Sequence, residues 1–282
     1  MNPILAWSLA LIGNFLLSLG MALQKRHVGW IRRGKAVSNV PVSAIERGND
    51  RSFWILGFVL MNVQPIFNYL ALLGLPPNVV GAVSGTNVAF SAVLARLMLG
   101  ERLGLRRGLC AAGIFVAAAV AGLRGGPSLG AYALGVMLAA AVPLAAGSVA
   151  YRLRNRGPGG GAAVALAATA GSLGGSMVLS MGALQMEGSS PLLWPASPYL
   201  YAYLVAGAGA FALLQVAYKR GELATVSPVF YGMQVLWPSL ASYAAFGSRF
   251  DAVQAGAFAA IGAAILVISR GSGKEGPRPE PR

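Results

Sequence analysis

Long apolar runs recur along the whole of this 282-residue chain, separated by short stretches that carry most of its charge. The hydrocarbon core of a bilayer is about 30 Å thick, so a helix that crosses it needs roughly 20 mainly apolar residues. Backbone groups in lipid have no water to bind, and each such run must therefore be helical. We predict about nine transmembrane helices, at residues 3–23, 53–73, 77–99, 104–123, 129–150, 161–184, 199–218, 225–246 and 252–269.

The composition indicates that most of the surface faces lipid rather than water. Hydrophobic residues make up 56% of the chain and charged residues 11%, whereas charged residues form about a quarter of a soluble domain. The net charge of +14 does not indicate nucleic-acid binding, because the basic residues fall in short groups and form no basic–aromatic stripe. We therefore predict an all-α, polytopic helix bundle in the cell membrane, with the lipid bilayer and no nucleic acid as partner.

The distribution of Lys and Arg predicts the orientation, because cytoplasmic loops are enriched in basic residues. With the N-terminus outside, every basic residue except Arg124 and Arg249 falls in a cytoplasmic loop, in the tail or at an adjoining helix end. The sequence starts Met1-Asn2-Pro3, without the basic residues that open a signal peptide. We expect a retained first helix, an outside N-terminus and a cytoplasmic C-terminus.

Two stretches, 79–103 and 226–250, correspond at a constant offset of 147 residues and share Gly-x-Arg near their ends. An odd number of crossings separates them, so their orientations are opposite, as in the inverted repeats of many secondary transporters. Polar positions correspond in the same register: Asn68 with Gln215, Ser84 with Tyr231, and Asn87 with Gln234. We predict a 4+5 inverted repeat, that is, four helices followed by five. The first repeat is predicted at 1–123 and contains a cytoplasmic loop at 24–52. The second repeat is predicted at 124–270, and a disordered tail at 271–282.

The stretch Leu99-Gly100-Glu101-Arg102-Leu103 resembles the sequence that ends the corresponding helix in the drug/metabolite transporter superfamily. Within that superfamily, which includes EamA-like exporters, the chain is most similar to the NIPA branch of magnesium transporters. The further matches are residues 14–25, Asn68-Tyr69, 79–103 and Val226-Ser227-Pro228-Val229-Phe230-Tyr231. This resemblance covers nearly the whole chain and implies nine spans and transport of Mg²⁺. It departs at Gln64-Pro65, where NIPA-like proteins carry an acidic residue.

Neutral polar side chains inside the spans are the candidate substrate ligands, because no acidic residue falls in the middle of a predicted span. Gln64 and Asn68 share a helix face, since they are four residues apart. The full set that we expect to line one central cavity is Asn14, Gln64, Asn68, Ser84, Asn87, Gln215, Tyr218, Tyr231 and Gln234. The alternative is that these groups join helices, where each stabilises packing by about 0.6 kcal/mol.

Several other residues have structural interpretations. Glu101 and Arg102 are expected at a cytoplasmic helix end outside the cavity, and His27 in a solvated loop. Proline is expected to interrupt helices and free backbone carbonyls at Pro65, Pro143, Pro228 and Pro238. The pair Gly171 and Gly175 is expected to permit close helix packing.

No enzyme class fits the residues available. The single histidine is expected in a loop, no acidic residue can pair with a serine inside the membrane, and the chain has neither a metal-ligand cluster nor a phosphate loop. We expect no catalytic residue, metal site or cofactor. The predicted function is transport of a small polar solute or cation by alternating access. Mg²⁺ and a small organic metabolite both remain open as substrates, as do a non-transporting scaffold subunit and a homodimer.

The topology can be tested with single cysteines at the two ends. A cysteine at Asn2 should react with an impermeant thiol reagent on intact cells, because the N-terminus is predicted outside. A cysteine at Ser272 should not react, because the tail is predicted to be cytoplasmic. The reverse pattern would contradict both the topology and the inverted repeat.

Overall fold

The structure is a computed structural model that describes residues 2–28, 44–72, 83, 85–101, 104–123, 133–153, 159–187, 191–246 and 251–271. Within these residues the chain is helical and contains no strand, which confirms the all-α prediction. The helices are α1 (Pro3–Arg26), α2 (Ala44–Leu72), α4 (Thr86–Leu99), α5 (Leu105–Leu123), α6 (Ala133–Leu153), α7 (Gly159–Met186), α8 (Pro198–Arg220), α9 (Leu223–Phe246) and α10 (Ala252–Gly271). A short 3₁₀ helix, η2 (Pro191–Ala196), precedes α8.

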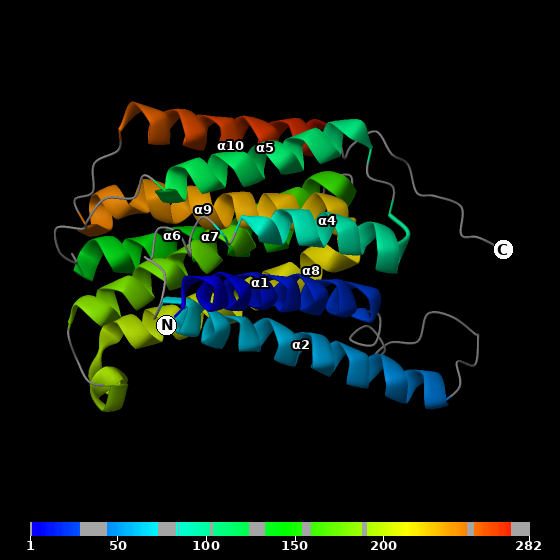
Figure 1. Cartoon of the computed structure of the whole chain (residues 1–282), viewed down its shortest axis with the longest axis horizontal. Coiled ribbons are helices and arrows are strands. Elements are labelled where there is room, and N and C mark those ends of the chain that lie inside the picture. The colour runs from blue at the N-terminus through cyan, green and yellow to red at the C-terminus, as the bar shows by residue number, and fades with distance from the viewer. Residues whose placement is uncertain are drawn as a thin grey trace.

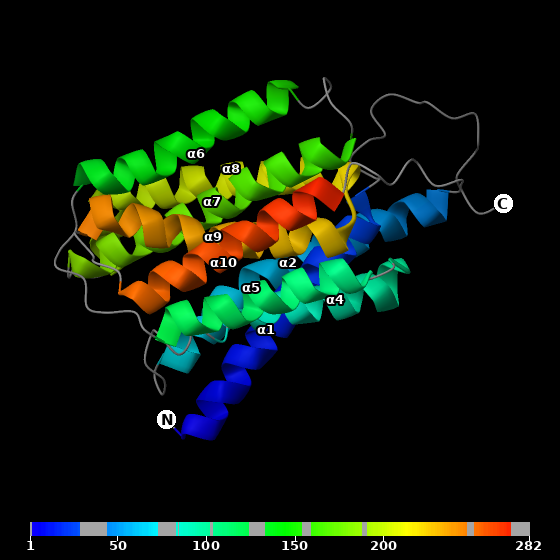
Figure 2. The same cartoon turned by 90° about the horizontal axis from the view of Figure 1, so that it is seen from above.

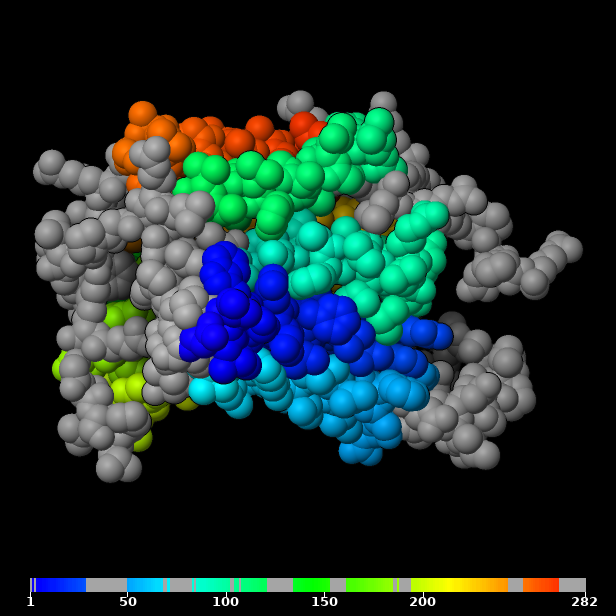
Figure 3. Space-filling view, in the orientation of Figure 1, coloured from blue at the N-terminus to red at the C-terminus, as the bar shows by residue number. Residues whose placement is uncertain are grey.

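The helices form one bundle with their axes along a common direction, and successive helices run in opposite directions (Figure 1). Helix α1 packs on α2 and α4, whereas α7 packs on α8 and α9. We call α1, α2, α4 and α5 the first group of helices and α6 to α10 the second group. The two groups meet where α5 packs on α10, α4 on α9, and α1 on α8. Helix α6 lies at one edge, far from α1 at the opposite edge (Figure 2). In the space-filling view, α1 lies at the surface between α2 and α4 (Figure 3).

Helix ends are set by local capping residues. The side chain of Asn2 accepts a hydrogen bond of 2.9 Å from the backbone N–H of Ile4, and proline occupies the first position of α1. Helix α8 begins in the same way, with Ser197 as cap and Pro198 at its first position. Both helices end in two basic residues, which interact favourably with the negative end of the helix dipole.

Two expectations about the helices are wrong: where α2 begins, and that prolines interrupt helices. Helix α2 begins at Ala44, inside the stretch 24–52 that was expected to be a loop. Its first turn contains Ala, Glu and Arg, which favour helix, so the helix extends beyond its apolar part. The internal prolines of α2, α6 and α9 do not interrupt these helices, because neighbouring turns keep their own hydrogen bonds. The tail 272–282 lies outside the described residues.

Glycines bring helix backbones together at two contacts. A Cβ atom on Gly20 of α1 would lie 2.5 Å from the carbonyl oxygen of Gly57 of α2, closer than packed atoms approach. On α7, a Cβ on Gly171 would overlap the carbonyl oxygen of Phe230, and one on Gly175 would overlap the Pro238 ring. The close packing predicted for Gly171 and Gly175 is therefore confirmed.

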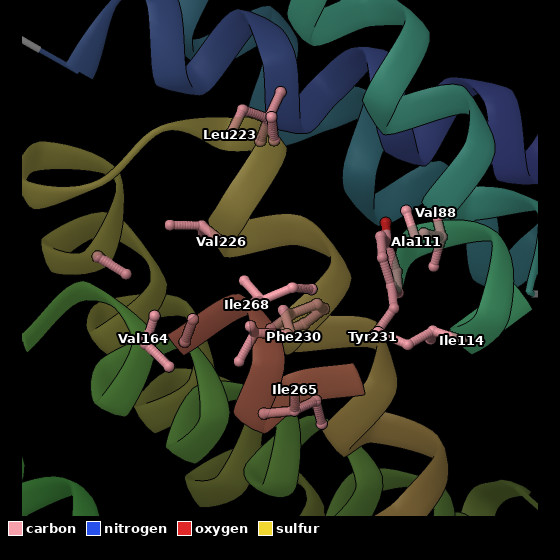
Figure 4. Close-up of a cluster of buried hydrophobic side chains, with 14 of the residues drawn as sticks. Val88, Ala111, Ile114, Val164, Leu223, Val226, Phe230, Tyr231, Ile265 and Ile268 are labelled. Atoms are coloured by element: carbon pink, nitrogen blue, oxygen red, sulfur yellow. The ribbon is translucent and has the colours of Figure 1, made fainter. Parts of the chain in front are cut away.

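Buried apolar side chains form a core that joins the two groups of helices. Other apolar side chains cover the outer faces of the bundle. In Figure 4, Val88 and Ile114 from the first group lie beside Tyr231 from α9. On the outer faces, Leu97 and Leu105 are 75% and 81% exposed. Four of the described helices are long and apolar enough to cross a membrane: residues 4–26, 134–152, 161–184 and 198–220.

Adding a methyl group at Gly171 should destabilise the fold. Gly171→Ala forces α7 away from α9, and overpacking of this kind costs about 1–3 kcal/mol. Gly262→Ala on α10 is the matched control, because nothing lies within 4 Å of its Cβ position. Alanine favours helix over glycine by about 1 kcal/mol, so this control should be neutral or stabilising. Thermal unfolding in detergent measures both; equal melting temperatures for the two variants would contradict the close contact.

Candidate functional site

One face of α1 carries polar side chains into the region where the two groups of helices meet. Asn14, Ser18, Met21 and Lys25 are spaced by four, three and four residues, which places them on one side of a helix. The first three are fully buried. We call the following set the polar seam: Asn14, Ser18, Met21, Gln24 and Lys25 of α1, Asn87 and Ser91 of α4, Gln215 and Tyr218 of α8, and Ser227 and Tyr231 of α9.

At one end of the polar seam, Asn14 joins three helices. Its Nδ2 donates to the carbonyl oxygen of Val83 at 2.8 Å and to Oγ1 of Thr86 at 3.2 Å. Its Oδ1 accepts from Gln64 on α2 at 3.5 Å and from Asn87 on α4 at 3.4 Å, both longer than a strong hydrogen bond. The short bonds hold Asn14 in place, while the amides of Gln64 and Asn87 are only weakly engaged.

In the middle of the polar seam, Tyr231 extends from α9 toward the first group of helices (Figure 4). Its hydroxyl donates to the sulfur of Met21 at 2.9 Å. The hydroxyls of Ser18 and Ser91 lie close to it, and the ring of Tyr218 from α8 is near enough to interact electrostatically. Hydroxyl groups from α1, α4, α8 and α9 therefore converge here.

Closer to the C-terminal end of α1, two glutamines connect three helices. Nε2 of Gln215 on α8 donates to Oε1 of Gln24 on α1 at 2.7 Å. The indole N–H of Trp54 on α2 donates to Oε1 of Gln215 at 3.2 Å. Gln24 and Gln215 are 0% and 6% exposed, so this chain of hydrogen bonds is shielded from solvent.

Four polar atoms of the polar seam are buried without a hydrogen-bond partner among the described residues. They are Nε2 of Gln24, Oγ of Ser91, the hydroxyl of Tyr218 and Oγ of Ser227. Leaving such a group unsatisfied costs about 1–3 kcal/mol, so native structures contain few of them. They belong to α1, α4, α8 and α9, so both groups of helices contribute to them.

Two charged side chains of the first group bind the turn between α8 and α9. Nζ of Lys25 donates to the carbonyl oxygens of Tyr218 and Gly221, at the C-terminal end of α8. The carboxylate of Glu101 accepts from the backbone N–H groups of Leu223 at 2.8 Å and Ala224 at 2.7 Å, at the start of α9. Each charge faces the helix end of opposite polarity and satisfies groups that have no partner within their helix.

Glu101 therefore differs from its expected role. It does follow the end of α4, but its side chain is only 8% exposed, whereas a surface position was expected. Burial raises the pKa of Glu101 above its usual range, and the two backbone N–H groups and Lys25 lower it only in part. Arg102 lies outside the described residues.

The predicted ligands do not all lie together. Asn14, Gln64 and Asn87 form one network, Tyr231 meets α1 one to two turns further along, and Gln215 binds Gln24. Gln234 lies beside Gly174 on α7, within the second group of helices. The side chains of Asn68 and Ser84 lie outside the described residues. That the nine residues line one cavity stays a prediction.

Sequence reasoning missed Ser18, Gln24 and Lys25. The spacing of polar residues along the first span was the available signal, because it marks a single face of the helix. His27 was expected to be solvated, but its Nδ1 lies 2.8 Å from Oδ1 of Asp50, and its ring stacks on Phe53. That expectation is wrong, because the helical start of α2 brings Asp50 beside the end of α1.

Among the described residues, no three His, Cys, Asp or Glu side chains lie close enough to hold a metal ion. No family model, no curated protein and no solved structure matches this chain. The resemblance to the drug/metabolite transporter superfamily thus rests on the sequence motifs alone.

Removing the Glu101 carboxylate should destabilise the protein. Glu101→Ala leaves two N–H groups of α9 unsatisfied and Lys25 without its opposite charge, which together should cost about 3–5 kcal/mol. Glu187→Ala, at an exposed acid after α7, should change the stability by less than about 0.5 kcal/mol. Unfolding in detergent measures both, and a double-mutant cycle with Lys25→Met should show non-additive effects. Similar stabilities for the two alanine variants would contradict the capping role.

Proposed function

We propose that this chain is a multi-pass membrane carrier that moves a small polar solute by alternating access. The observation that carries the proposal is the polar seam, where four unpartnered buried polar atoms gather between the two groups of helices. A role in joining helices does not account for these four atoms, because polar residues that join helices are hydrogen-bonded to each other.

The surface supports placement of the bundle in a membrane. Long apolar side chains cover its outer faces; Ile4 and Leu134, for example, are 74% and 72% exposed. Apolar surface of this kind marks contact with lipid or another protein. Helices α1 and α8 run in the same direction (Figure 1), and both end in basic residues. This agrees with the prediction that both ends are cytoplasmic.

The arrangement of helices supports the predicted inverted repeat. Adding the offset of 147 to the bounds of α5 gives 252–270, which coincides with α10 (Ala252–Gly271). Helix α1 packs on α2 and α4 as α7 packs on α8 and α9, and the equivalent pairs α4–α9 and α5–α10 meet each other. Helix α6 has no counterpart, as a 4+5 division requires.

In this proposal the two repeats move relative to each other about the polar seam. The glycine contacts keep α1 with α2 and α7 with α9, so each group moves as a unit. Lys25 and Glu101 join the groups at one end in the structure described here. Opening at that end must separate these charges from the α8–α9 turn, and water or solute then replaces the helix ends as their partners.

Labelling of a cysteine inside the polar seam tests the proposal without knowledge of the substrate. Ser227→Cys is made in a Cys110→Ala background, because Cys110 is the only cysteine of the chain. An impermeant thiol reagent should modify it from either side of sealed vesicles, because a carrier exposes its central site alternately to both. Modification from one side only, or from neither, would contradict alternating access, and the latter would favour a scaffold.

Ser172→Cys is the matched control for this experiment. Ser172 is 5% exposed and its hydroxyl donates to the carbonyl of Ala168 in its own helix, within the second group. It should remain unmodified from both sides. Equal modification of both variants would indicate general opening of the protein in the membrane.

A further inference from the structure

The direction of the hydrogen bonds at Gln24 is determined by a tryptophan. An indole N–H can only donate, so the atom of Gln215 that faces Trp54 must be its oxygen. The NH₂ group of Gln215 is then the one that faces Gln24, and it needs an oxygen there. Oε1 of Gln24 is thus engaged, and its NH₂ group is left as a buried donor without an acceptor.

Packing holds this chain of donors in its orientation. The Trp54 ring stacks on Phe58 at 6.1 Å and meets the edge of Phe211 at 5.8 Å between ring centroids. The stem of Gln24 lies against Gly57, where an added Cβ would be 3.0 Å from Cγ of Gln24. These neighbours hold the indole and the Gln24 stem in place, and the indole donor then determines which way the two amides face.

We propose that Gln24 binds an acceptor oxygen of the transported solute, with the hydroxyl of Tyr218 as a second contact. Tyr218 follows Gln215 on α8 by one turn, is fully buried and also has no partner. The solute class is one that carries a carboxylate, phosphate or carbonyl oxygen. This inference rests on the proposed function and specifies its ligand.

The same geometry disfavours Mg²⁺ at this position. A divalent cation takes oxygen ligands, usually carboxylates and waters, and it is repelled by the positive end of an N–H dipole. The oxygen of Gln24 is already occupied by Gln215, and the neighbouring ammonium of Lys25 adds positive charge. A neutral or anionic acceptor instead satisfies the unpartnered donor, which an amide or hydroxyl needs when it is buried.

Thermal shift of the full-length protein in detergent tests the ligand class, because a ligand of the folded state raises its melting temperature. The probes are sodium acetate, sodium phosphate, acetamide and MgCl₂, at constant ionic strength. At least one of the first three should raise the melting temperature by about 2 °C or more, and MgCl₂ should not. Acetate and phosphate test for an anionic acceptor, and acetamide tests for a neutral one. Stabilisation by MgCl₂, or by none of the probes, overturns the proposal.

Substitutions at Gln24 assign the response to this residue. Gln24→Glu has the same length but exchanges the donors for acceptors, so it should lose the response to acceptor probes and gain stabilisation by MgCl₂. Gln24→Met has no donor and should lose the response without gaining one for Mg²⁺, which keeps the test valid if the buried carboxylate prevents folding. An unchanged response in Gln24→Met overturns the assignment.

The matched control is Gln254→Glu in the first turn of α10. Oε1 of Gln254 accepts from the backbone N–H of Asp251 at 3.2 Å, and a carboxylate keeps this bond. Its responses to all four probes should equal those of the unmodified protein. A change in this control equal to that in Gln24→Glu would overturn the assignment to Gln24.

Trp54→Phe tests the positioning role of the indole. Without the donor, Gln215 and Gln24 can reverse their amides, so the discrimination between acceptor probes and MgCl₂ should weaken. A fully retained discrimination would contradict this role. Labelling of Ser227→Cys in the Gln24→Met background separates the two proposals. If this cysteine is modified from both sides and the probe response is unchanged, only the ligand assignment is wrong. If Ser227→Cys with Gln24 intact is not modified from both sides, the proposed carrier function is wrong.

Discussion

A turn between two helices exposes four carbonyl groups of the first and four N–H groups of the second, and inside a bundle these need partners. At the turn between α8 and α9 the partners come from the other group of helices. Lys25 binds the carbonyls of Tyr218 and Gly221, and Glu101 binds the N–H groups of Leu223 and Ala224. The rest of the polar seam extends away from this point along α1, so the position of α1 against α8 and α9 depends on it.

Each charge is placed against a helix end of opposite polarity, which offsets part of the electrostatic cost of its burial. The contact between the two groups of helices is therefore specific, because each charge fits only one of the two helix ends. In the proposed transport cycle, this is the contact that must separate.

The helix positions followed from the sequence, because the length of an apolar run is a local property. The span expected at 252–269 corresponds to α10 (Ala252–Gly271), and the span at 199–218 to α8 (Pro198–Arg220). The start of α2 was missed, because its first turns are polar and indistinguishable from a loop by hydropathy.

Contacts between distant residues could not be predicted in this way. Glu101 binds Leu223, 122 residues away, and a glutamate that follows a helix is usually solvated. Tyr231 and Gln234, three residues apart, were both expected to line the central cavity. They diverge because α9 lies between α1 and α7, so that one residue meets Met21 and the other Gly174. Which neighbour a helix face meets depends on tertiary packing.

The contact between Tyr231 and Met21 has a consequence for oxidation chemistry. A thioether is a weak acceptor, and Met21 is fully buried, so peroxide can reach its sulfur only if α1 and α9 separate. Oxidation to the sulfoxide would replace this weak acceptor with a strong S=O group directly opposite the Tyr231 hydroxyl. The modified side chain would then bind α9 more tightly than the thioether does.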